Sequence, residues 1–171
     1  MKSLKLISFV FIFFGILPFT RSVYSEKNDS ANYKVLSSTN KSFSISTVEL
    51  NIIEGDNFIK KGDFEKAKES FKKARELSKK MAIFYLDINN SFKGIDARVP
   101  NEMKKKGLAI LKIQAKTNER LASIYIREEH PEVAVPLLVE IIRIMSPNSI
   151  EGKKAYQNLI KLGFLETPFN G

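Results

Sequence analysis

The chain has 171 residues, with 28 Lys and Arg against 19 Asp and Glu, and its formal net charge is +9. This length suits one domain of common size. The absence of cysteine excludes disulfides, thiolate metal sites and a lipoprotein attachment thiol. The single histidine, His130, leaves too few nitrogen ligands for a protein-bound transition metal. We therefore expect neither a metal site nor a cofactor.

The first 25 residues have the composition of a signal peptide. Lys2 and Lys5 precede an apolar stretch over residues 6–19, and a short polar stretch then ends at Ser25. We expect export, with cleavage between Ser25 and Glu26. The alternative is an uncleaved N-terminal membrane anchor, although this stretch is shorter than the roughly 20 apolar residues that a spanning helix needs.

The rest of the chain divides into three segments. Residues 26–45 are rich in Ser, Asn and Lys with scattered hydrophobic residues, which predicts a disordered tether. Apolar residues recur at helical spacing over residues 46–165, which predicts a helical domain. Residues 166–171 form a short C-terminal tail.

The first two helices are predicted on either side of a short turn. Ser46 and Glu49 have the spacing of a capping box, so a first helix is expected over about residues 47–61. Gly62 and Asp63 have the residue types that end one helix and begin the next. The second helix carries one long apolar stripe of Phe64, Ala67, Phe71, Ala74, Leu77, Met81, Phe84, Tyr85, Ile88 and Phe92.

Three more helices are predicted in the C-terminal half. Residues 94–100 read as a loop, and a second long helix is expected over about residues 101–127, packed antiparallel to the first long helix. His130 and Pro131 form the next turn. The following helix ends near Pro147, and a last helix, from about residue 150 to Gly163, covers the end of the domain.

A pattern of small and large residues recurs 67 positions apart. The first copy comprises Gly55, Phe58, Ala67, Phe71 and Ala74, and the second comprises Ala122, Tyr125, Ala134, Leu138 and Ile141. Small residues at these places let two helices approach closely. The pattern resembles the tetratricopeptide repeat. The resemblance implies an all-α fold of the α-solenoid type, built of helical hairpins, here with about five helices of which the central two are extended. It also implies a binding scaffold, without indicating the partner.

A second likeness concerns the stretch from Phe92 to Phe169. This stretch is similar to uncharacterised exported tetratricopeptide-like proteins of cyanobacteria and plastids. That similarity implies a location in the periplasm or the thylakoid lumen.

The resemblance also implies where a partner binds. In tetratricopeptide domains the first helix of each pair lines a concave groove that holds an extended peptide. The matching positions here are Ile52, Asp56, Ile59 and Lys60 in the first copy, and Glu119, Ser123, Ile126 and Arg127 in the second. Lys60 and Arg127 fall at the same repeat position and are candidates to hold a carboxylate of an acidic peptide or a C-terminus. The alternative is that each only complements the negative C-terminal end of its own helix.

Charge and loop composition leave further candidates. Residues 60–127 carry 18 basic and 8 acidic side chains, so the middle helices hold the positive surface. Such a surface attracts acidic proteins, anionic membranes or nucleic acid, and export argues against nucleic acid. The loop around Arg98 is a second candidate for partner recognition. No catalytic motif is present, so we expect a protein-binding scaffold. The alternatives are a peripheral protein on anionic lipid and a structural subunit of a larger complex, and the oligomeric state is open.

Overall fold

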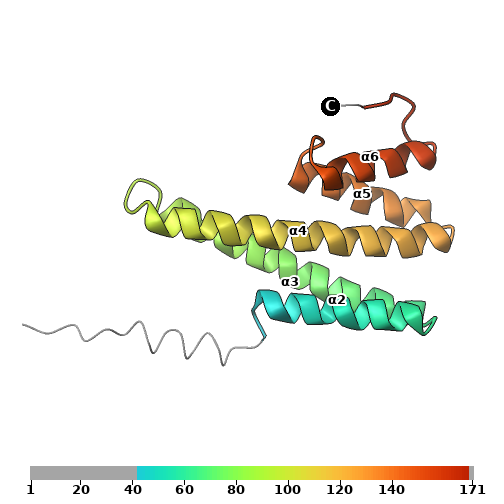
Figure 1. The fold of residues 1–171 in the computed structure, drawn as a ribbon, viewed down its shortest axis with the longest axis horizontal. Coiled ribbons are helices and arrows are strands. Elements are labelled where there is room, and N and C mark those ends of the chain that lie inside the picture. Colours follow the sequence, from blue (N-terminus) through green and yellow to red (C-terminus); the bar gives the residue numbers. More distant parts are fainter. Residues whose placement is uncertain (1–41, 170–171) are drawn as a thin grey trace, which may run out of the picture.

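The computed structural model describes residues 42–169, and within them the chain forms five helices and no strand (Figure 1). The predictions for the signal peptide and for most of the tether therefore lie outside the described residues. The all-α class is confirmed. The helices are α2 (Ile45–Lys60), α3 (Phe64–Ser91), α4 (Arg98–Arg127), α5 (Pro131–Met145) and α6 (Ile150–Lys161).

Each helix packs against the next along the chain, and α2, α4 and α6 lie on a different side of the stack from α3 and α5. The long helices α3 and α4 form an antiparallel hairpin whose outer half projects beyond the other helices (Figure 1). Helix α4 also contacts both α2 and α6 directly, whereas the backbones of α3 and α5 do not meet within the described residues. Consequently α2, α4 and α6 lie side by side on one face of the molecule.

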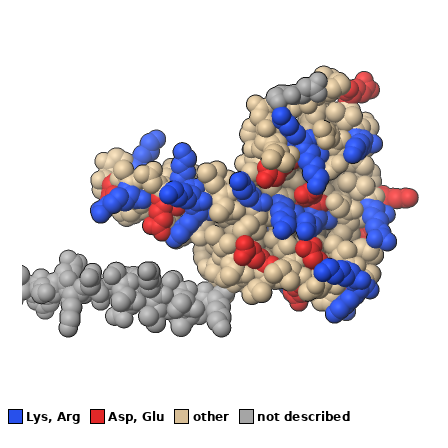
Figure 2. Space-filling view, in the orientation of Figure 1, with Lys and Arg blue, Asp and Glu red and all other residues tan. Residues whose placement is uncertain are grey.

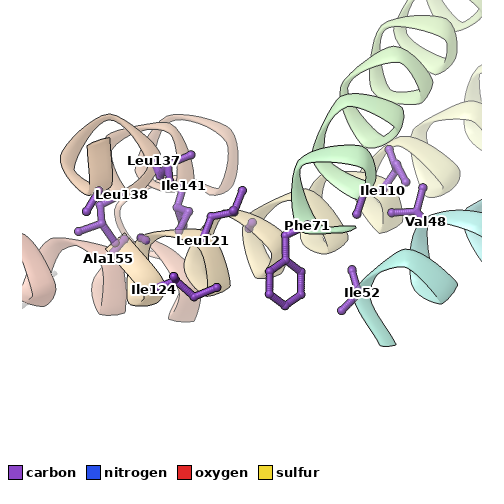
Figure 3. Packing of buried hydrophobic residues seen from close by; sticks show 14 of the residues in the cluster. Val48, Ile52, Phe71, Ile110, Leu121, Ile124, Leu137, Leu138, Ile141 and Ala155 are labelled. Atoms are coloured by element: carbon purple, nitrogen blue, oxygen red, sulfur yellow. The ribbon is translucent and has the colours of Figure 1, made fainter. Parts of the chain in front are cut away.

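The buried core follows the 67-residue pattern. Phe71, Ala74, Ala122, Leu138 and Ile141 are all buried. Figure 3 shows the core continuing from Val48 and Ile52 of α2 to Leu137, Leu138 and Ala155 of α5 and α6. The spacing therefore marks real packing positions.

The turns between paired helices also repeat at this spacing. Gly62 has a φ of +76°, and Glu129, which stands 67 residues later, has a φ of +61°. Asp63 caps α3 as predicted, because its carboxylate accepts a hydrogen bond from the Lys66 amide at 3.1 Å. Both short turns thus contain a residue in the left-handed conformation at the same repeat position, a glycine in the first turn and a glutamate in the second.

Two predicted helix starts were wrong by a few residues. Helix α2 begins at Ile45 because Ser44, and not Ser46, is the capping residue, with its hydroxyl accepting from the Thr47 amide at 3.2 Å. Helix α4 begins at Arg98, so Pro100 lies in its first turn, where an absent amide costs no hydrogen bond. Asp96 accepts from the Arg98 amide at 2.8 Å and so satisfies one of the free amides at that helix end.

The apolar stripes of α3 and α4 are only half covered. Phe84 and Phe92 belong to the predicted stripe but are exposed in the projecting half of the hairpin, and so is Leu108 of α4. Phe84 has two aromatic neighbours, Phe43 at a ring distance of 5.9 Å and Tyr85 at 5.4 Å. The apolar stripe of α3 is therefore buried only as far as Met81 and Tyr85, because α2 and α5 reach only the inner half of the hairpin.

The C-terminal tail lies against α6. The Tyr156 hydroxyl donates to the Thr167 carbonyl at 2.8 Å, and the rings of Tyr156 and Phe169 are 5.7 Å apart. Gly163 ends the helix with a φ of +77°. The tail therefore covers part of the last helix.

Candidate functional site

A groove lies on the face where α2 and α4 meet. It has a volume of about 220 Å³ and brings together residues from the end of α2, the start of α3 and the C-terminal half of α4. Its floor is apolar and its rim is polar. The lining residues are Ile59, Phe64, Glu119, Arg120, Ser123, Ile124 and Arg127.

Two rim charges are already used within the fold. Arg120 of α4 donates to both carboxylate oxygens of Asp56 in α2, with distances of 2.6 and 3.1 Å. Glu119 forms an ion pair with Lys154 of α6. These pairs connect α4 to its neighbours on either side, so they hold the three helices of this face together.

Arg127 is the rim charge that remains available. Its guanidinium carbon lies 4.4 Å from the centroid of the Phe64 ring, and the residue is exposed. Among the described residues no carboxylate pairs with it. Stacking on Phe64 orients the guanidinium while its N–H donors stay free for an anion.

The structure brings only some of the predicted binding residues together. Ser123 and Arg127 line the groove, and the Ser123 hydroxyl donates to the Glu119 carbonyl at 2.8 Å. Asp56 lies beside the groove in its pair with Arg120. Lys60 is exposed at the last residue of α2 but does not line the groove.

Two further candidates lie elsewhere. Ile52 was expected to face the groove but is buried in the core instead. Arg98 lies at the far end of α4, where its guanidinium is 2.7 Å from Asp96. Hydrogen bonds from the Arg98 side chain and amide lower the pKa of Asp96 to about 2. Arg98 therefore belongs to the hairpin tip, remote from the groove.

Sequence reasoning missed a buried polar network centred on Glu140 of α5, whose exposed fraction is only 8%. Arg75 of α3 lies 2.5 Å from its carboxylate, and Lys79 lies 3.4 Å from it. The amides of Gln114 and Asn118 in α4 each donate to it at 3.1 Å. The sequence feature that could have indicated this network is the group of polar residues Gln114, Thr117 and Asn118 on the inward side of α4.

The network lowers the pKa of Glu140. Burial raises this pKa, but the hydrogen bond and charge of Arg75, the charge of Lys79 and the hydrogen bond from Asn118 together outweigh burial. The carboxylate therefore stays ionised inside the fold. A group with a lowered folded pKa stabilises the protein above its unfolded pKa, here near 4.5, and loses that effect as pH falls.

We expect the wild type to have a higher free energy of unfolding than Glu140→Gln, and we expect this difference to be largest at neutral pH. As pH falls below 4.5, protonation of Glu140 makes the wild type resemble the variant, so the difference in unfolding free energy shrinks. Urea unfolding of both proteins at pH 7 and pH 3 measures this. Other carboxyl groups titrate in both proteins and cancel in the comparison. A difference that does not change with pH would contradict the assignment.

Neither a metal centre nor a spanning segment is found in the described part of the chain. No three His, Cys, Asp or Glu side chains between residues 42 and 169 lie together as a metal ion would require. His130 is exposed and lies 3.0 Å from Glu132. No helix in this range is long and apolar enough to cross a membrane.

Comparisons with known proteins found no counterpart. A scan against protein-family models, a search of curated proteins and a search of solved structures each gave no match to the chain.

Proposed function

We propose that this protein is an exported, non-catalytic binding scaffold that holds an acidic peptide or a protein C-terminus in the groove between α2 and α4. The observation that carries the proposal is Arg127, an exposed guanidinium that is stacked on Phe64 and lacks a carboxylate partner in the described chain. Beside it, Ile59 and Ile124 supply an apolar floor. Together these features suit a carboxylate with a hydrophobic neighbour.

The arrangement of the helices supports a tetratricopeptide-like scaffold. Helices α2, α4 and α6 lie side by side through direct contacts, while α3 and α5 have separated backbones. Packing of this kind curves a helical stack toward the side where helices approach most closely. Export is part of the proposal on the strength of the first 25 residues, whose composition is that of a signal peptide.

The proposal is tested with an array of decapeptides that have free C-terminal carboxylates. We expect the full chain to bind a subset of them and to lose binding when the same peptides are amidated. Arg127→Gln should weaken binding by about tenfold or more, because a charge-assisted hydrogen bond contributes about 1.5–3 kcal/mol. Fluorescence anisotropy with the selected peptides measures the change.

Lys60→Gln is the matched control for this experiment. Lys60 is an exposed cation at the end of the neighbouring helix and does not line the groove, so its removal should have little effect. If both variants lost peptide affinity equally, the site would contain two cations, Lys60 and Arg127, as expected from the repeat positions, and not Arg127 alone. Binding that is indifferent to Arg127, or absent for all peptides, would overturn the proposal.

A further inference from the structure

A large hollow lies between the projecting halves of α3 and α4. It has a volume of about 670 Å³, and we call it the hairpin hollow. Three of its lining side chains are strongly exposed apolar residues, namely Ile83 at 59%, Leu86 at 57% and Leu108 at 52%. Neighbouring exposed apolar side chains of this kind mark a surface that another molecule covers.

The hairpin hollow continues the groove beside which α5 lies. Glu140 of α5 is held by Lys79 of α3 and by Gln114 of α4. Along α3, Leu86 follows Lys79 by two helical turns on the same side. Along α4, Leu111 precedes Gln114 by three residues and Leu108 precedes it by six. One groove therefore runs along the whole hairpin.

Helix α5 packs on α4 beside the inner part of this groove and reaches α3 through the ion pairs of Glu140 with Arg75 and Lys79. It ends at Met145, five residues after Glu140, and the chain then turns away toward α6 at Ser146, which has a φ of +75°. The open part extends along α4 from Leu111 to Pro100, a length of about 17 Å. This length accommodates about three turns of another helix.

The rim of the hairpin hollow is positively charged. Lys93 and Lys104 line it, and no Asp or Glu does. Neither lysine has a carboxylate partner among residues 42–169. Figure 2 shows several Lys and Arg side chains on this projecting end of the molecule, with some Asp and Glu among them. The inner part of the same groove already pairs its cations with the carboxylate of Glu140.

We propose that the hairpin hollow docks an amphipathic helix of a partner protein, with apolar side chains toward Leu86 and Leu108 and carboxylates toward Lys93 and Lys104. The partner helix would extend the row that α5 begins, and it would meet the groove cations as Glu140 does. A second copy of this chain fits poorly, because two hollows face to face would bring four lysines together. This site is separate from the groove of Arg127.

The test selects helices from a displayed library. Each member is a 15-residue helix with leucines fixed on one stripe and with all other positions randomised, and it is selected on the purified full chain at low salt. Members that also bind the variant Leu86→Ser/Leu108→Ser are removed. We expect Asp and Glu to be enriched beside the leucine stripe. Enrichment of Lys and Arg, or no binder that depends on the hollow, would overturn the proposal.

Lysine variants then test the charges. The double variant Lys93→Gln/Lys104→Gln should bind the selected helices about tenfold or more weakly, since charge-assisted contacts are lost. The matched control is Lys80→Gln/Lys105→Gln, which removes two exposed lysines that do not line the hollow. Equal losses in the two double variants would show general attraction and would contradict the assigned site.

Two other occupants of the hairpin hollow, a membrane surface and a second copy of the chain, would give different experimental results. If vesicles of phosphatidylcholine and phosphatidylglycerol bind the chain through Leu86 and Leu108 while no helix does, the hollow is a membrane-contact surface. If sedimentation shows a dimer that Leu108→Ser abolishes, a second copy covers the hollow. Either result overturns the proposal. Arg127→Gln should leave helix binding unchanged, so failure here is distinguishable from failure of the peptide groove.

Discussion

Replacing Glu140 with alanine is expected to lower the free energy of unfolding by about 3–5 kcal/mol, the usual loss when one partner of a buried ion pair is removed. The substitution leaves the Arg75 guanidinium without its carboxylate at 2.5 Å and removes the acceptor of the Gln114 and Asn118 amides. Such a loss is a large part of the stability of an ordinary domain. Urea unfolding followed by circular dichroism measures it.

The matched control is Glu132→Ala in the same helix. Glu132 is exposed and its carboxylate lies 3.0 Å from His130, which is also exposed, so its loss should cost under about 1 kcal/mol. A double-mutant cycle of Arg75→Ala with Glu140→Ala should show strong coupling, because each residue is the other's closest charged partner. Similar costs for Glu132→Ala and Glu140→Ala would show that the network contributes no special stability.

Gly55→Ala is expected to destabilise the protein even though alanine favours helix over glycine by about 1 kcal/mol. A Cβ atom at Gly55 would lie 2.5 Å from Cε1 of Phe71, and this ring is fully buried and has little room to move. The ring itself is essential to the contact, so Phe71→Ala should cost about 3–5 kcal/mol. Thermal unfolding of both variants measures the two effects.

Gly107→Ala supplies the control for this contact. A Cβ atom there would lie 3.7 Å from Cβ of Tyr85, an ordinary distance, so this substitution should be neutral or stabilising by up to about 1 kcal/mol. Adding Phe71→Leu to Gly55→Ala should recover part of the loss, because the smaller side chain leaves space for the new methyl group. If both glycine variants raised the melting temperature, the close approach of α2 and α3 would be refuted.

Local signals explain why most helices were predictable. Asp63 and Gly62 act through their own backbone geometry, so a sequence pattern suffices to place that turn. The 67-residue spacing likewise predicted buried positions, since Phe71 and Leu138 occupy matching places in the core. These features depend on residues close together in the chain or on a repeated pattern.

Features that depend on distant residues were not predictable in the same way. The Glu140 network joins residues 65 positions apart, and its members look like ordinary surface residues in the sequence. Periodicity showed that α3 and α4 each have an apolar side, but only the packing of α2 and α5 decides how much of that side is covered. In the groove, Asp56 proved to be engaged by Arg120, a partner 64 residues away.

The Glu140 network also sets the register of α5 along its groove. From Val133 to Ile144 this helix is apolar on most sides, so hydrophobic contact alone would permit several positions along the hairpin. A slide of one turn, about 5.4 Å, toward the tip would move the ionised carboxylate from Gln114 to Leu111. That displacement would break the hydrogen bonds from the Gln114 and Asn118 amides and the close ion pair with Arg75. The network therefore opposes a movement of this helix toward the open end of the groove.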